Sequence, residues 1–255
     1  MTPNVLVLTP VKNAAPEAAG FVDRLLALTH PAAHLALGLL ASDSDDDTPE
    51  VFRTEMSRLV DAGWRSARLW QRDFGYRIPD GTPRWEPSIQ LQRRKTLALS
   101  RNHLLFNALT DDIDWVLWID ADVLEYRADI IELMLSLRRD IIQPHCVQQW
   151  DGPTFDLNAW RDKGRLHLDD LRKEGFLAKL DAVGGTMLFV RADCHRDGLI
   201  WPPFLYGVAN PLIRTDPAMI GRPEIGEIET EGLGMMAADM GLTCWGLPLV
   251  EIRHR

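Results

Sequence analysis

The chain has 255 residues, of which 46% are apolar, enough to bury a sizeable core in one large domain or two small ones. Its 28 basic and 37 acidic side chains give a formal net charge of −9. This balance argues against a partner such as nucleic acid or an anionic membrane bound non-specifically, because that binding needs a basic face.

The cysteine pattern and the hydropathy pattern indicate the cellular environment. Cys146, Cys194 and Cys244 are odd in number and scattered, which predicts reduced thiols instead of a disulfide framework. No apolar run approaches the roughly 18 residues that a membrane span needs. The first residues also lack the basic region and cleavage site of a signal peptide. We therefore expect a soluble, cytoplasmic protein with no membrane span.

Short apolar runs alternate with amphipathic stretches in the first part of the chain, which favours an α/β fold. The pattern predicts strands at residues 4–9, 34–41 and 64–70, and helices at 17–29 and from 48 onward. Thr48, Pro49 and Glu50 give the second helix a capping residue, an early proline and early acidic charge. Residues 71–88 are rich in proline and glycine and carry no period. They predict a loop, and loops of this length are often functional.

The same alternation continues in the rest of the chain. The pattern predicts helices at 88–109, 127–138 and 229–240, and strands at 114–119, 140–147, 183–190 and 243–252. We find no internal repeat. The simplest interpretation is one domain over residues 1–255, with a Rossmann-like, mostly parallel sheet flanked by helices.

The strongest local motif is a pair of carboxylates that follows the predicted strand at 114–119. Asp120 and Asp122 are two positions apart, so both side chains can face one cleft at the carboxyl edge of the sheet. Two converging carboxylates suit Mg²⁺ or Mn²⁺, which keep positions open for substrate phosphates. The plainer alternative is that both acids end the strand and cap a turn. Another is a phosphatase of the haloacid dehalogenase type with Asp120 as nucleophile, but that motif usually lies near the start of its domain.

A basic stripe on the predicted helix at 88–109 is the second candidate. Arg94, Arg101 and Asn102 share one face through their spacing, and two guanidiniums with an amide could bind a diphosphate. The alternative is a solvated basic face. The helix leads directly into the strand that carries Asp120, which favours the binding interpretation.

Three weaker features complete the candidate site. Residues 155–161 interleave aromatic and polar groups, a pattern of carbohydrate sites, with Asn158 and Trp160 as candidate acceptor contacts. Glu229 and Glu231 open a predicted helix, where acidic residues usually complement the helix dipole. His254 follows an extended run and could return to the sheet edge as a third metal ligand, or belong to a frayed tail.

Taken together, six ordered blocks of sequence resemble the Anp1-type family of fungal Golgi α-mannosyltransferases, the mannan-polymerase subunits of glycosyltransferase family 62. The blocks are LVLTPVKN at 6–13, LSRN at 99–102, DWVLWIDAD at 114–122, FDLNAW at 155–160, VGGTM at 183–187, and IETEG at 228–232 with GLP at 246–248. They span nearly the whole chain and are therefore more specific than a carboxylate pair alone. The fungal members carry a membrane anchor and stem that we do not find here, so the mannan acceptor does not transfer.

The resemblance implies a GT-A fold, a GDP-mannose donor, Mn²⁺ as metal and retention of anomeric configuration. It implies that Asp120 and Asp122 serve the metal and the nucleotide sugar, and that His254 completes the metal shell. The expected nucleotide-sugar contacts are Thr9, Pro10, Lys12, Asn13, Arg94, Arg101, Asn102, Asp120, Ala121, Asp122 and Gly185.

The expected reaction expels a diphosphate, whose developing charge must be stabilised. Arg101 or Lys12 could assist the metal in this role. Asp156, Glu229 and Glu231 are the carboxylates expected near the anomeric carbon or the acceptor hydroxyl, and the sequence does not choose among them. The acceptor is a glycan or a small molecule. Transfer from another nucleotide sugar, and a non-catalytic subunit that only binds a nucleotide sugar, remain as alternatives.

Overall fold

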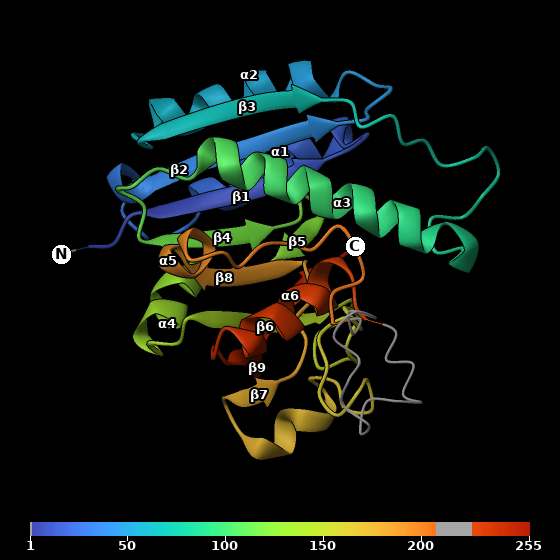
Figure 1. The fold of residues 1–255 in the computed structure, drawn as a ribbon. Helices are drawn as coiled ribbons and strands as arrows, with labels where there is room; N and C mark the ends of the chain where they lie inside the picture. Colours follow the sequence, from blue (N-terminus) through green and yellow to red (C-terminus); the bar gives the residue numbers. More distant parts are fainter. Residues whose placement is uncertain (1, 208–225) are drawn as a thin grey trace.

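The computed structural model of the chain describes residues 2–207 and 226–255, and a mixed nine-stranded sheet runs through them (Figure 1). Short β7 (Ala178–Leu180) pairs with β9 off the main path of the sheet. Along that path the order is β3 (Ser66–Arg72), β2 (Leu35–Ser42), β1 (Val5–Val11), β4 (Trp115–Ile119), β8 (Met187–Arg191), β6 (Ile141–Val147), β9 (Cys244–His254) and β5 (Val123–Glu125).

The longest ladders of the sheet are parallel. β1 with β2, β2 with β3, and β6 with β9 each pair seven residues in parallel. β8 is antiparallel to both of its neighbours, β4 and β6, and so joins two parallel regions. Every residue of β2 is buried, as expected for a strand covered on both faces. The predicted α/β fold with a mostly parallel sheet is confirmed.

Helices cover both faces of the sheet and form two apolar cores (Figure 1). On one face lie α1 (Ala18–Leu26), α2 (Thr48–Asp61) and α4 (Ile130–Ser136). On the other lie α3 (Pro87–Ala108), α5 (Ala192–Arg196) and α6 (Glu229–Asp239). Gly38 lets α3 approach β2, since an added Cβ would come within 2.7 Å of Leu8 Cδ2 and 3.1 Å of Ala108 Cβ.

Short elements are the main addition to the predicted order. They are β5, β7, α5 and three 3₁₀ turns, at Ala15–Glu17, Ala32–His34 and Asp170–Glu174. Elements of three to five residues are too short to show a hydrophobic period. The predicted strand at 183–190 begins at Met187, because Val183–Thr186 forms the turn that leads into it. Within the described residues, no helix has both the length and the apolar character of a membrane span.

Candidate active site

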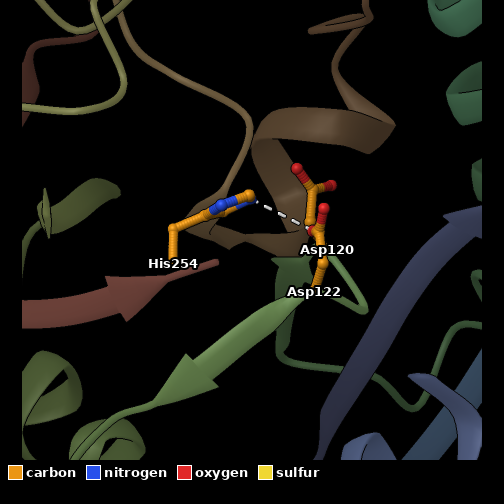
Figure 2. A group of neighbouring side chains, drawn as sticks. All are labelled: Asp120, Asp122 and His254. Carbon is orange, nitrogen blue, oxygen red and sulfur yellow. Dashed lines mark ion pairs between the residues drawn. The ribbon is translucent and has the colours of Figure 1, made fainter. Parts of the chain in front are cut away.

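Three potential metal ligands meet at one edge of the sheet (Figure 2). Asp120 directly follows β4, Asp122 directly precedes β5, and His254 is the last residue of β9. One ligand atom from each residue lies within 4.8 Å of the others. The register of β5 against β9 produces this meeting, because it places Val123 opposite His254. The backbone N–H of Asp120 donates a hydrogen bond to the carbonyl of Thr186 (2.9 Å). This bond fixes the start of the turn that joins β4 to β5.

The electrostatics of these three residues suit a cation. Burial raises the pKa of Asp120 to about 6, against the opposing charge of Arg101. Burial is the largest single influence on both groups of the neighbouring pair, Asp122 and His254, and acts against both charges. The hydrogen bond between Asp122 Oδ1 and His254 Nε2 (3.1 Å), the attraction between the two charges and backbone hydrogen bonds together outweigh it. The pKa of Asp122 is therefore lowered and the pKa of His254 raised. Two carboxylates and an imidazole form a donor set that fits Mn²⁺.

A cleft of about 550 Å³ opens in front of these ligands. It runs over the carboxyl ends of β1, β2 and β4, the edge where α/β sheets bind ligands. Of the predicted nucleotide-sugar contacts, the cleft is lined by Pro10, Lys12, Asn13, Asp120, Ala121 and Asp122, together with His254. The Thr9 side chain is buried, and its hydroxyl donates to the Ile119 carbonyl (2.8 Å).

A loop after β3 forms part of the wall of the cleft. We call residues 73–77 the 73–77 loop, and Tyr76 in it lines the cleft. Buried Asp43 accepts hydrogen bonds from the backbone N–H groups of Phe74 (2.9 Å) and Tyr76 (3.1 Å) and from Arg77 (3.1 Å). Lys12 Nζ donates to the Tyr76 carbonyl (2.9 Å). The predicted 71–88 loop therefore contributes to the site through specific contacts.

The helix α3 presents a different face to the cleft from the predicted stripe. Arg93, Thr96, Leu97 and Ser100 line the cleft. The three residues of the predicted stripe, Arg94, Arg101 and Asn102, are instead bound inside the protein.

The partners of that stripe are carboxylates and backbone. Arg101 is buried, pairs with Glu229, and lies 3.6 Å from Asp120 Oδ1. Arg94 pairs with Glu231 and donates to the Ile228 carbonyl (2.5 Å). Glu229 has a φ of 61°, a left-handed conformation that is uncommon outside glycine.

Asn102 is committed to the backbone of Trp201, with which it exchanges hydrogen bonds of 2.7 and 2.9 Å. Gly185 lies against Arg101, where an added Cβ would come within 2.3 Å of Nη2. Neither Asn102 nor Gly185 lines the cleft. Both therefore support the wall of the site from within.

The predicted carboxylate Asp156 is buried and close enough to Asp120 for their charges to interact. It accepts hydrogen bonds from the Thr186 hydroxyl (2.8 Å) and from the Asn158 side chain (3.2 Å). Gly184 permits this position, since an added Cβ would lie 1.9 Å from Asp156 Oδ2. The backbone of Trp160 pairs with Ala182. Asn158 and Trp160 therefore make contacts that support the site from within the protein.

Several cleft residues were missed from the sequence. They are Glu17, Ser42, Asp43, Tyr76, Ile78, Arg84, Arg93 and Arg255. The aperiodic 71–88 segment was the available signal for Tyr76, Ile78 and Arg84. Arg93 is next to Arg94 of the predicted stripe in the sequence. The rotation of α3 turns Arg93, and not that stripe, toward the cleft.

Comparison with solved structures defines the class of protein. The mannosyltransferase PcManGT from Pyrobaculum calidifontis, solved with GDP-Man and Mn²⁺, superposes with a TM-score of 0.61 at 16% identity, over 100% of this chain and 57% of that one. Residues 1–349 of Staphylococcus aureus TarS, solved with UDP, give 0.54 at 11% identity, over 98% of this chain and 59% of that one. The chain has the GT-A fold of these glycosyltransferases.

Sequence comparison then gives the family. The Anp1 family model matches residues 1–177, and the chain belongs to this family. The mannan polymerase complex subunit mnn9 of Schizosaccharomyces pombe is 29% identical over 98% of this chain and 79% of its own length. The mannan polymerase II complex anp1 subunit of the same yeast is 27% identical over 98% of this chain, which spans only 63% of that relative. The predictions of family and of a glycosyltransferase are confirmed.

Proposed function

We propose that residues 1–255 act as one domain, a Mn²⁺-dependent retaining glycosyltransferase that moves an α-mannosyl group from GDP-mannose to a glycan or small-molecule acceptor. The observation that carries this proposal is the Asp120–Asp122–His254 group at the edge of a cleft of about 550 Å³. The names of the relatives, and the GDP-Man and Mn²⁺ bound to PcManGT, favour this donor and this metal.

The residues of the cleft suit the charge of a nucleoside diphosphate. Asp120, Asp122 and His254 would hold the metal, which when bound supplies a Lewis acid for the diphosphate oxygens. Lys12, Arg84 and Arg93 line the same cleft and place positive charge where the leaving group develops its negative charge. Within the Thr9–Asn13 segment, Pro10, Lys12 and Asn13 line the cleft and would contact the guanine.

Retention needs either a nucleophile on the far face of the sugar or attack from the leaving-group face. Asp156 and Glu229 are buried and bound by internal partners, and Glu231 pairs with Arg94. These contacts favour attack from the leaving-group face. The bond from the anomeric carbon to the phosphate oxygen then breaks, the bond to the acceptor oxygen forms, and the acceptor proton passes to the diphosphate.

Thermal unfolding with GDP, UDP, CDP or ADP, each with and without Mn²⁺, tests the proposal. We expect GDP with Mn²⁺ at one hundred times Kd to add about 2.7 kcal/mol, which raises Tm by roughly 5–10 °C for a chain of this size. Asp122→Ala should abolish the effect. Asp111→Ala is the matched control, because Asp111 is exposed before the other end of β4.

Three results would contradict the proposal or a part of it. Metal-dependent GDP binding of normal strength in Asp122→Ala would place the metal elsewhere. Equal turnover of UDP-glucose and GDP-mannose would overturn the donor assignment. Binding of GDP-mannose without transfer or hydrolysis would favour a non-catalytic subunit.

A further inference from the structure

Phe155 makes a specific contact with the imidazole of His254. The two rings are stacked, with centroids 4.5 Å apart and planes 28° apart. His254 lines the cleft but Phe155 does not, so the phenyl ring meets the imidazole from outside the cleft. Phe155 is 39% exposed, so its ring is held on one side by the imidazole and open to solvent on another.

The chain on both sides of Phe155 is fixed. Its backbone N–H donates a hydrogen bond to the carbonyl of Cys146 in β6 (2.8 Å). The preceding residue, Thr154, forms a bridge with Val147, and the following residue, Asp156, is buried against Thr186. The ring of Phe155 is therefore presented from a rigid support.

The imidazole depends on such a support when a metal is bound. Strand β9 fixes the backbone of His254, but the terminal torsion of a histidine side chain is soft. Nδ1 lies 3.1 Å from the Arg255 carbonyl and Nε2 lies 3.1 Å from Asp122. A metal at Nε2 would take the place of the proton that joins Nε2 to Asp122. That hydrogen bond would then be lost, whereas the contact of Nδ1 with the Arg255 carbonyl and the stack on Phe155 would remain.

We propose that Phe155 is a positioning residue that fixes the plane of the His254 imidazole and thereby raises the metal affinity of the Asp120–Asp122–His254 group. The inference rests on the metal site of the proposed function and adds to it a residue that would act on the metal through His254.

Mn²⁺ titration without nucleotide, followed by the electron paramagnetic resonance of free Mn²⁺, tests this role apart from activity. We expect Phe155→Ala to weaken Mn²⁺ binding roughly tenfold, the lower end of the loss when a group supporting a metal ligand is removed. Phe155→Tyr keeps the ring and should bind Mn²⁺ as the unaltered protein does. Leu157→Ala is the matched control, because Leu157 is an exposed apolar residue of the same segment.

A double-mutant cycle separates positioning from general damage to the loop. In a His254→Ala background, Phe155→Ala should cause no further loss of Mn²⁺ affinity, because its target is gone. An equal loss in both backgrounds would show that the ring acts through the loop and would overturn the proposal. Unchanged affinity in Phe155→Ala, with binding abolished in Asp122→Ala, would overturn it too while leaving the metal site intact. Full affinity in Asp122→Ala would instead refute the metal site of the proposed function.

Discussion

His195 shows what burial does to a single titratable residue. Its side chain is enclosed, Trp118 Nε1–H donates to its Nε2 (3.2 Å), and its Nδ1 lies 2.7 Å from the Leu199 carbonyl. These partners require a neutral ring with its proton on Nδ1. A second proton would face the N–H of Trp118. Burial lowers the pKa of His195 to about 4, in spite of the hydrogen bond to Leu199.

The lowered pKa of His195 predicts that the folded protein loses stability in acid. The unfolded chain protonates His195 near pH 6.5, whereas the folded chain resists protonation down to about pH 4. The stabilisation is therefore complete above pH 6.5 and is lost as the pH falls toward 4, by about 3 kcal/mol in all. Urea unfolding at pH 7 and pH 5 measures this loss. His195→Gln cannot take up the proton and should lose less stability between these pH values; an equal loss in both proteins would contradict the prediction.

At the same scale, the sequence predicted the meeting of the candidate metal ligands at the sheet edge better than the position of the basic side chains. Asp120 and Asp122 follow a strongly apolar strand, so their place at the sheet edge is encoded locally. The three- and four-residue spacing on α3 correctly groups Arg94 with Arg101, but it does not say which way that stripe faces. The rotation of α3 is set by buried residues such as Leu104 and Leu105, which pack on the sheet. That packing turns Arg93 toward the cleft.

The 73–77 loop shows how one residue can order an element. Asp43 has a φ of 54° and is buried, and its carboxylate receives two backbone N–H groups of the loop. At position 43, asparagine would tolerate this backbone conformation and keep an oxygen that accepts hydrogen bonds. Alanine would do neither.

We expect Asp43→Ala to release the loop while the sheet stays folded. Hydrogen exchange at the amides of Phe74 and Tyr76 should accelerate by roughly 5-fold to 100-fold, because each amide loses a hydrogen bond worth about 1–3 kcal/mol. Nucleotide affinity should fall with it, since Tyr76 lines the cleft. Asp43→Asn should show little change in either. Unchanged exchange at both amides in Asp43→Ala would show that other contacts order the loop.

Elements were predictable where they are long enough to carry a pattern. The apolar run of β2 and the start of α2 at Thr48 lie as predicted, whereas β5 and β7, with three residues each, could not be distinguished from loop. β5 matters for the site in spite of its length, because it pairs with β9 beside His254.

At the scale of the whole molecule, composition and alternation were enough to predict the α/β class. The local sequence of a strand does not determine its direction in the sheet. That β8 lies antiparallel between β4 and β6 was therefore seen only in the structure. The meeting of Asp122 with His254 was expected from the extended run before His254 and from the family resemblance, and the structure produces it through the pairing of β5 with β9.

The position of β9 between β6 and β5 has a consequence for folding kinetics. Asp122 and His254 are remote in sequence, and contacts of this kind carry a large cost of loop closure. The Asp120–Asp122–His254 group is complete only after β9 has paired with both neighbours. The proposed Mn²⁺ site is therefore incomplete until late in folding.

We expect Mn²⁺ at one hundred times Kd to slow unfolding about a hundredfold and to leave the refolding rate unchanged. Stopped-flow mixing with urea, monitored by tryptophan fluorescence, measures both rates, with Asp122→Ala as the control that should show no metal effect. Faster refolding with Mn²⁺ would mean that the ligands meet before the transition state. On the expected outcome, the ion lengthens the lifetime of the folded chain without changing how fast the chain reaches it.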